Sequence, residues 1–416
     1  MSKNIIIAGG GIIGLCSAYY LHKEGYRVTV IDKSDMTKGT SYVNAGYITP
    51  SHIITLASPG SVKKGMKWMF KPASPFYVKP RFDADFFRWA WYFKKSATKA
   101  KVQKAVPLIK ELNLLSRTLY KEIYDSGDLG AFHLEHKGVL VVYKTDKNRE
   151  EELGIAALAE KEGLDLHILS RDALKKIEPA IHPDVIGAIN YTCDAHTSPN
   201  QIMEKLKNYL ANSGVIFKRN EKVLQFKKSG DSIARVITDK EEYSPDEVVI
   251  AAGSWTPELT RIIGLKLPLQ AGKGYRINVE RPLKINMPAI LSEPKVAVTP
   301  MQGFTRFAGT MEFSGLNHTI RKERVLAIAK AVSGYYENMS FEQEETDNAQ
   351  CGLRPVSPDG LPYIGRTSKA RNLIIATGHA MMGWSLGPVT GKLVSEIVSG
   401  KTLSLDIKAC HPERRF

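Results

Sequence analysis

The chain has 416 residues, 43% of them hydrophobic and 24% charged, which is the composition of a soluble globular protein with two or three domain-sized units. No apolar run approaches the roughly 20 residues that span a bilayer, and no nucleic-acid-binding motif accompanies the net charge of +15. We expect no signal peptide, because the first strand begins at Asn4. We also expect no metal site, because the four cysteines lack the spacing of metal ligands. The missing signal peptide and the cysteine pattern together indicate a reducing cytoplasm.

The first elements of the chain are typical of a dinucleotide site. An apolar strand over 5–8 leads into Gly9, Gly11 and Gly14, and a helix and a second apolar strand follow, ending at Asp32. Gly9 allows a tight turn, Gly11 lets the backbone approach a pyrophosphate, and Gly14 lets the helix pack closely on the strand. The helix N-terminus faces the phosphates, and Asp32 can accept hydrogen bonds from a ribose, which favours FAD or NAD over NADP.

A basic and aromatic stretch follows between Lys63 and Lys104. It holds twelve Lys and Arg residues against two Asp residues, with aromatic residues interleaved. This combination is typical of an interfacial membrane contact. The alternative is a pair of solvated helices whose aromatic side chains are core, because helical periodicity explains many of them.

The remaining elements alternate without a repeat or a low-complexity linker, so domains are expected to interleave. In chain order, the pattern predicts helices over about 83–126, a strand over 138–143, helices over 148–163 and 171–177, a strand over 185–191, a helix over 199–213, strands over 215–218, near 223, over 233–238 and over 247–252, strands between 267 and 313, a helix over 321–338, a strand over 372–376 and a helix over 389–399.

The C-terminal segment distinguishes between the two cofactors. A second unit of strand, glycine loop and helix begins at Asn372, and its helix starts near Gly387-Pro388. The positive N-terminal end of that helix would stabilise negative charge on a reduced flavin, whereas a simple NAD dehydrogenase needs no such unit. The alternative is a terminal helix that only caps the domain.

With these motifs, the chain resembles the FAD-dependent amine and amino-acid oxidoreductases of the D-amino-acid oxidase type. It is most similar to the D-amino acid dehydrogenases, including those of D-proline and D-hydroxyproline. The residues that carry the resemblance span nearly the whole chain: the N-terminal fingerprint, Thr40-Ser41 with Asn44-Ala45-Gly46, Lys67-Trp68-Met69-Phe70, Ala251-Ala-Gly-Ser-Trp255, Lys273-Gly-Tyr275, Gly352-Leu-Arg-Pro355 with Pro358-Asp-Gly360, and Thr377-Gly-His379 with Gly383-Trp384.

The resemblance implies an α/β fold in which a Rossmann-like FAD-binding domain is interleaved with an α+β antiparallel-sheet substrate domain. The first domain would comprise 1–60, 196–264 and 351–416, and the second 61–195 and 265–350. The FAD would be non-covalent, because Cys351 lies too far from Ser357-Pro-Asp to match the cysteine that carries flavin in some amine oxidases. The residues implied to surround the cofactor are Gly9, Gly11, Ile12, Ile13, Gly14, Asp32, Lys33, Thr40, Ser41, Asn44, Ala45, Gly46, Val223, Gly253, Trp255, Gly360, Gly378, His379, Gly383 and Gly387.

Arg354 is the candidate that binds substrate, because a guanidinium offers a bidentate fork for an amino-acid carboxylate. The alternative is an arginine paired in the core, and Arg306 is a second, weaker candidate. Tyr275 and His52 could also reach the substrate, although such residues are more often simply packed. His379 could hydrogen-bond the flavin or a substrate carboxylate, or equally be a structural cap beside the glycine loop.

We therefore expect oxidation of a small D-amino acid, D-proline and hydroxy-D-proline included, by hydride transfer from Cα to flavin N5. Electrons would pass to a quinone or another carrier, from a cytoplasmic protein that lies at the inner face of the membrane if the 63–104 stretch binds lipid. The alternatives are an O2-using oxidase of the glycine or sarcosine oxidase type, a flavin dehydrogenase of a 2-hydroxy acid, and a non-catalytic FAD protein. The oligomeric state and the exact substrate do not follow from the sequence.

Overall fold

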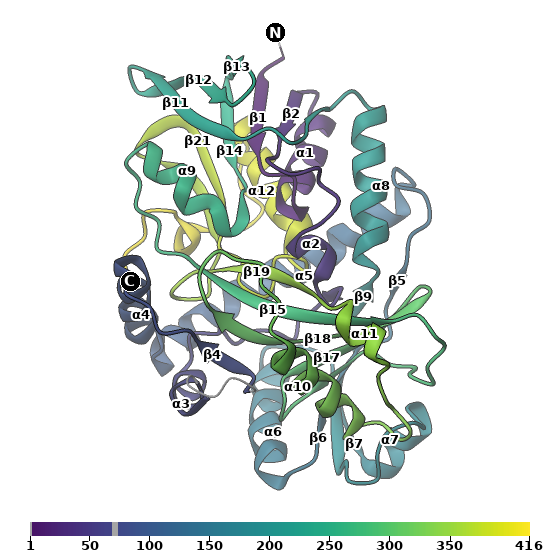
Figure 1. Cartoon of the computed structure of the whole chain (residues 1–416). Coiled ribbons are helices and arrows are strands. Elements are labelled where there is room, and N and C mark those ends of the chain that lie inside the picture. The colour runs from purple at the N-terminus through teal and green to yellow at the C-terminus, as the bar shows by residue number, and fades with distance from the viewer. Residues whose placement is uncertain (1, 69–73) are drawn as a thin grey trace.

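The computed structural model describes residues 2–68 and 74–416 (Figure 1). Within the helix over 59–68, the side chains of Ser61, Lys64, Met66 and Lys67 are not described. Met69 and Phe70, which contributed to the family resemblance, and Lys71 of the basic stretch lie outside the described residues.

A six-stranded sheet forms the upper half of the molecule in Figure 1, with strand order β10-β2-β1-β14-β21-β20. Five strands run parallel and β20 is antiparallel to β21. Parallel strands are buried on both faces, which explains their continuous apolar runs. The strands are β1 (Asn4–Ala8), β2 (Arg27–Ile31), β10 (Ile216–Lys218), β14 (Glu247–Ile250), β20 (Tyr363–Thr367) and β21 (Ala370–Thr377).

The two faces of this sheet are covered differently. Ile5, Ile7 and Val30 pack against α1 (Ile12–Lys23), α8 (Pro199–Asn212) and α12 (Gly387–Ser399). Ile6 and Val248 pack instead against a small antiparallel sheet. That sheet consists of β11 (Val223–Ser229), β12 (Ser232–Thr238) and β13 (Glu242–Tyr243). The strand and helix predictions at both ends of the chain are confirmed.

A larger sheet forms the lower half, in the order β19-β15-β18-β17-β16-β6-β8-β7, with β4 paired to β18. It is mainly antiparallel, as predicted, but β16 pairs with β6 and β18 with β4 in parallel, so the sheet is mixed. Its strands are β4 (Phe76–Val78), β6 (Val139–Tyr143), β7 (His167–Ser170), β8 (Gly187–Tyr191), β15 (Gln270–Val279), β16 (Ala289–Leu291), β17 (Val296–Met301), β18 (Phe304–Phe313) and β19 (Gln350–Val356). By its hydrogen bonds β19 belongs to this sheet, although the sequence analysis placed 351–416 in the other domain.

Short helices flank the larger sheet: α6 (Asp146–Lys161), α7 (Arg171–Ile177), α10 (Lys322–Ser333) and α11 (Gln343–Asp347). The helix predicted over 321–338 is too long, because α10 ends at Ser333 and Gly334 follows it. A glycine disfavours continuation of a helix.

The remaining elements join the two halves. The bounds are α2 (Thr40–Val43), β3 (Tyr47–Ile48), α3 (Pro59–Trp68), α4 (Ala84–Ser96), α5 (Lys99–Asp125), β5 (Leu134–Glu135), β9 (Ala195–Thr197), η1 (Gly253–Trp255), α9 (Thr256–Ile262) and η2 (Lys408–Cys410). The α5 helix lies within the predicted substrate segment, yet its Leu112 and Leu119 pack with Leu386 and Leu393 around α12. Among the described residues, no helix combines the length and apolar character needed to cross a bilayer.

Candidate active site

A cavity of about 1310 Å³ lies where the two sheets meet. Pockets for small ligands commonly measure roughly 300–1,000 Å³, so this larger cavity has room for a dinucleotide together with a small substrate. Most predicted site residues line it: Gly9, Gly11, Ile12, Ile13, Asp32, Lys33, Thr40, Ser41, Asn44, Ala45, Gly46, His52, Val223, Gly253, Trp255, Tyr275, Arg354, His379 and Gly383.

Four predicted glycines do not line the cavity: two of them allow close packing of helices and two form turns. A Cβ on Gly14 would lie 1.9 Å from the carbonyl oxygen of Gly9, and one on Gly387 would lie 2.8 Å from Ile12. These two glycines let α1 pack against β1 and α12 respectively. Gly360 and Gly378 have φ of +81° and +80°, a backbone conformation that residues with a side chain rarely adopt, so they form turns.

The N-terminus of α1 faces the cavity and is held by polar contacts. The Asp32 carboxylate accepts the Gly10 N–H at 2.7 Å, and the Ser41 hydroxyl accepts the Ile12 N–H at 2.9 Å. Gly9, at φ +118°, leaves no room for a Cβ, because one would lie 2.4 Å from the carbonyl oxygen of Ala251. Asp32 therefore fixes the glycine turn itself, in addition to any ribose contact predicted for it.

The loop that contains the short α2 helix is held from both sides. The Thr40 hydroxyl accepts the Leu353 N–H at 2.9 Å and donates to the Leu353 carbonyl at 3.0 Å. Arg306 is fully buried and donates to the carbonyls of Tyr42 and Asn44 at 2.8 and 2.7 Å. Arg306 does not line the cavity, so this weaker substrate candidate is a positioning residue for the loop.

His379 is buried beside the glycine loop at the opposite end of the cavity. Its Nε2 lies 2.9 Å from the Thr390 hydroxyl, which itself donates to the Leu386 carbonyl at 2.7 Å. The His379 proton is therefore assigned to Nε2, and Nδ1 carries a lone pair. Burial lowers the pKa of His379 to about 3 and that of His52 to about 4, so both rings are neutral at pH 7.

Arg354 reaches into the cavity from β19. Its Nη1 donates to the Thr310 carbonyl at 2.9 Å, and among the described residues it forms no ion pair with a carboxylate. A Cβ at position 274 would lie 2.0 Å from Nη1, so a side chain there would displace the guanidinium from this position. Burial lowers the pKa of Arg354 to about 10, which leaves it cationic at neutral pH.

Thr310 is a further residue of the site that was not predicted from the sequence. It lies where the register between β15 and β18 shifts, and its φ is +67°, an uncommon conformation for a residue other than glycine. The bulge turns the Thr310 carbonyl toward Arg354, and its buried hydroxyl lines the cavity with no partner among the described residues. No sequence signal marks this position, because a bulge depends on the register of distant strands.

Tyr275 lines the cavity, but its hydroxyl points elsewhere. It donates to Glu312 at 2.8 Å, and Glu312 also pairs with Lys273 at 3.1 Å and with Arg324 at 3.3 Å, all of them buried. Burial and the carboxylate raise the pKa of Tyr275 well above its usual value. The predicted contact between this hydroxyl and substrate therefore has a competing partner.

The cavity fits a flavin dinucleotide on its own geometry. At one end, the N-terminus of α1 lies beside glycines that leave no room for a side chain. At the other end are α12 and a second glycine loop. His379 belongs to that loop, and its Nδ1 has no hydrogen-bond partner among the described residues. The fold and this site define a dinucleotide-dependent oxidoreductase.

Comparison with known proteins gives the family. A model described as FAD dependent oxidoreductase (DAO) matches residues 4–397, and the chain belongs to this family. D-amino acid dehydrogenase from Helicobacter pylori is 30% identical over 399 residues, which are 95% of each chain. The protein is thus an FAD-dependent oxidoreductase with FAD as its cofactor.

Solved structures support the same fold. Glycine oxidase from Geobacillus kaustophilus has a TM-score of 0.80 at 20% identity, over 100% of each chain. L-proline dehydrogenase from P. horikoshii has a TM-score of 0.75 at 19% identity, over 99% of this chain and 97% of that one.

Proposed function

We propose that this enzyme oxidises a small amino acid at Cα, with D-amino acids, D-proline among them, as the first substrates to test. Arg354 carries the proposal, because it is a half-buried cation at the cavity wall and the carboxylate of an amino acid supplies the anion that it lacks. The similarity of the whole chain to D-amino acid dehydrogenases supports the same substrate class. When bound, FAD supplies a hydride acceptor at N5.

The residues around Arg354 orient the substrate rather than move its protons. The Thr310 carbonyl holds one nitrogen of the guanidinium and Gly274 leaves room beneath it, which orients the fork at the cavity wall. A buried cavity favours the neutral amine over the ammonium, and the neutral amine is the form whose lone pair assists oxidation at Cα. His379 and His52 are neutral and the Tyr275 hydroxyl is committed to Glu312, so none of them is assigned as a proton donor.

Replacement of Arg354 tests the substrate assignment. Arg354→Ala removes a charge-assisted, two-pronged contact worth about 3 kcal/mol, so kcat/KM for a D-amino acid falls roughly a hundredfold. Arg354→Lys retains the charge and recovers only part of the loss. Arg235→Ala, on the exposed face of β12, is the matched control and leaves kcat/KM unchanged. An unchanged kcat/KM in Arg354→Ala would contradict the assignment.

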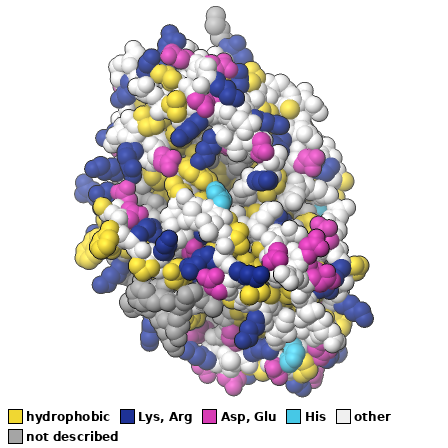
Figure 2. Space-filling model, viewed as in Figure 1, with side chains coloured by type: hydrophobic (Ala, Val, Ile, Leu, Met, Phe, Trp, Pro, Cys, Tyr) yellow, Lys and Arg dark blue, Asp and Glu magenta, His cyan; other side chains and the backbone are white. Residues whose placement is uncertain are grey.

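We further propose that electrons leave to a quinone at a membrane surface. One face of α4 lines the cavity through Phe86, Trp89 and Phe93, while Phe87 and Trp91 are 57% and 63% exposed. The exposed neighbours Arg88, Lys94, Lys95, Lys99, Lys101 and Lys104 are basic. Figure 2 shows hydrophobic side chains among Lys and Arg side chains at the left edge, where Figure 1 places α4. Aromatic rings and cations on one surface favour contact with anionic lipid.

A further inference from the structure

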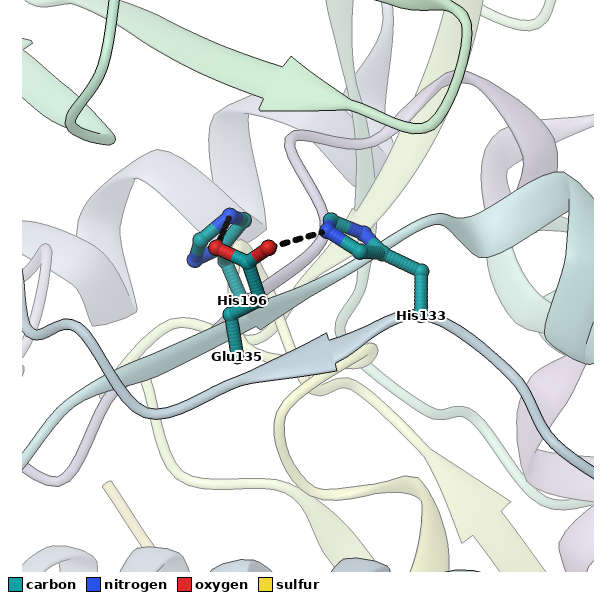
Figure 3. Close-up of side chains that lie close together, drawn as sticks. All are labelled: His133, Glu135 and His196. Carbon is teal, nitrogen blue, oxygen red and sulfur yellow. Dashed lines mark ion pairs between the residues drawn. The ribbon is translucent and has the colours of Figure 1, made fainter.

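We propose that His133, Glu135 and His196 bind a divalent transition-metal ion of the zinc class. The site lies on the small sheet β3-β9-β5, outside the cofactor cavity. Figure 3 shows the Glu135 carboxylate between the two imidazole rings. The spacing of the cysteines predicts no metal site, and none of these three residues is a cysteine.

The pairing of two short strands brings these side chains together. His133 and Glu135 are two residues apart in an extended segment, so they lie on the same face. Glu135 is directly opposite His196 in the antiparallel pair β5–β9, which places the third side chain on that face.

The distances suit a single ion. Glu135 Oε1 lies 3.3 Å from His133 Nε2, and Oε2 lies 3.7 Å from His196 Nε2. One ligand atom from each residue lies within 4.8 Å of the others. A tetrahedral zinc ion with bonds of about 2.0–2.2 Å holds its ligand atoms roughly 3.3–3.5 Å apart, so small side-chain rotations complete the site.

His196 is buried and its polar contacts are weak. Its side chain is 0% exposed, neither ring nitrogen has a well-formed hydrogen bond among the described residues, and its polar neighbours are the Pro300 backbone and the Glu135 carboxylate at 3.7 Å. A buried polar group without a partner is costly, and a metal ion would satisfy it.

The surroundings support a ligand role for the other two residues. His133 Nδ1 lies 2.9 Å from the Ser198 hydroxyl, a contact that orients Nε2 toward Glu135 as outer-shell partners of metal-bound histidines do. His133 and Glu135 line a surface depression together with Pro300 and Gln302, which provides an entry path. Two imidazoles and one carboxylate favour zinc and neighbouring transition metals over calcium or magnesium.

A competing cation is already present. Lys137 Nζ lies 2.7 Å from Glu135 Oε2, so an incoming ion displaces this ammonium.

A bound ion would also stabilise the strand β9, which contacts the wall of the cofactor cavity: Thr197 donates its N–H and hydroxyl to the Gly46 carbonyl at 2.8 and 2.9 Å and accepts the Trp384 indole N–H at 2.8 Å. Gly46 and Trp384 both line the cavity.

Equilibrium dialysis of the FAD-loaded enzyme against ZnCl2, after removal of metal with a chelator, tests the site. We expect one zinc ion per chain. Glu135→Gln and His133→Gln each lower the zinc affinity at least about tenfold, while Lys137→Ala raises it by removing the competing ammonium. His136→Gln replaces an exposed histidine between Glu135 and Lys137 and leaves the affinity unchanged.

Thermal unfolding provides a second readout. Zinc raises the Tm of the wild-type enzyme and not that of Glu135→Gln, because an ion that binds only the folded state stabilises it by mass action. FAD content and circular dichroism confirm that each variant is folded. Failure of the wild type to bind zinc saturably, or equal zinc affinities in the wild type, Glu135→Gln and His133→Gln, would overturn the proposal.

Discussion

At the scale of single residues, the partner of a side chain decides its role, and the sequence does not name that partner. Arg354 and Arg306 both belong to the larger sheet. Arg306 is buried and donates to the carbonyls of Tyr42 and Asn44, in the loop that contains α2, whereas the half-buried Arg354 has one backbone contact and lines the cavity. The sequence predicts Tyr275 as a substrate contact, but its hydroxyl donates to Glu312. The motifs predicted which residues gather, but not where their polar ends point.

Asp194 gives a prediction at this scale. It is 1% exposed and accepts the N–H and the hydroxyl of Ser51 at 3.0 and 2.6 Å, and burial raises its pKa to about 7. The unfolded chain releases this proton near pH 4, so the folded state binds more protons between pH 4 and 7 and loses stability as pH rises through that window.

Asp194→Asn removes the titration while its amide can still contact Ser51. Between pH 4 and pH 7, we expect the free energy of unfolding of the wild type to fall by up to about 4 kcal/mol relative to that of this variant. The pKa of Asp194 differs by about three units between the folded and unfolded states, and each unit corresponds to about 1.36 kcal/mol. Urea unfolding at both pH values measures the difference. A stability difference that does not change with pH would show that Asp194 ionises normally.

At the scale of elements, α4 has two apolar faces where a solvated helix has one. Packing alone explains the aromatic residues on its inward face. The exposed side chains of Phe87 and Trp91 have no such explanation, so they distinguish a membrane contact from a core helix. The Asp83 side chain caps this helix by accepting the N–H groups of Asp85 and Phe86 at 3.0 and 3.1 Å, which fixes the direction of both faces.

Sedimentation with vesicles tests this surface. The enzyme is expected to sediment with vesicles that contain anionic lipid, and less so as salt is raised. Phe87→Ser with Trp91→Ser weakens this binding roughly tenfold or more, because two exposed rings no longer insert. Ile168→Ser, at a site of equal exposure on β7, is the control. Equal sedimentation of the double variant and the wild type would refute the membrane contact.

At the scale of the whole molecule, local signals predicted the parallel sheet well. The strand, glycine turn and helix at each end of the chain follow from patterns within 30 residues, and the structure brings both ends to one cavity. Features that depend on long-range pairing were not predictable. The parallel pair β6–β16, the bulge at Thr310 and the contact of Glu135 with His196 each join segments far apart in sequence.

Anaerobic reduction of the bound FAD tests the proposed function most directly. The holoenzyme is mixed without O2 with D- and L-amino acids, D-proline, hydroxyprolines, glycine, sarcosine and 2-hydroxy acids, and the flavin absorbance is followed. We expect a D-amino acid to bleach the flavin rapidly, Arg354→Ala to slow that bleaching roughly a hundredfold at limiting substrate, and the 2-hydroxy acids to leave the spectrum unchanged. Bleaching by a 2-hydroxy acid alone, or by no amino acid in the series, would contradict the proposal.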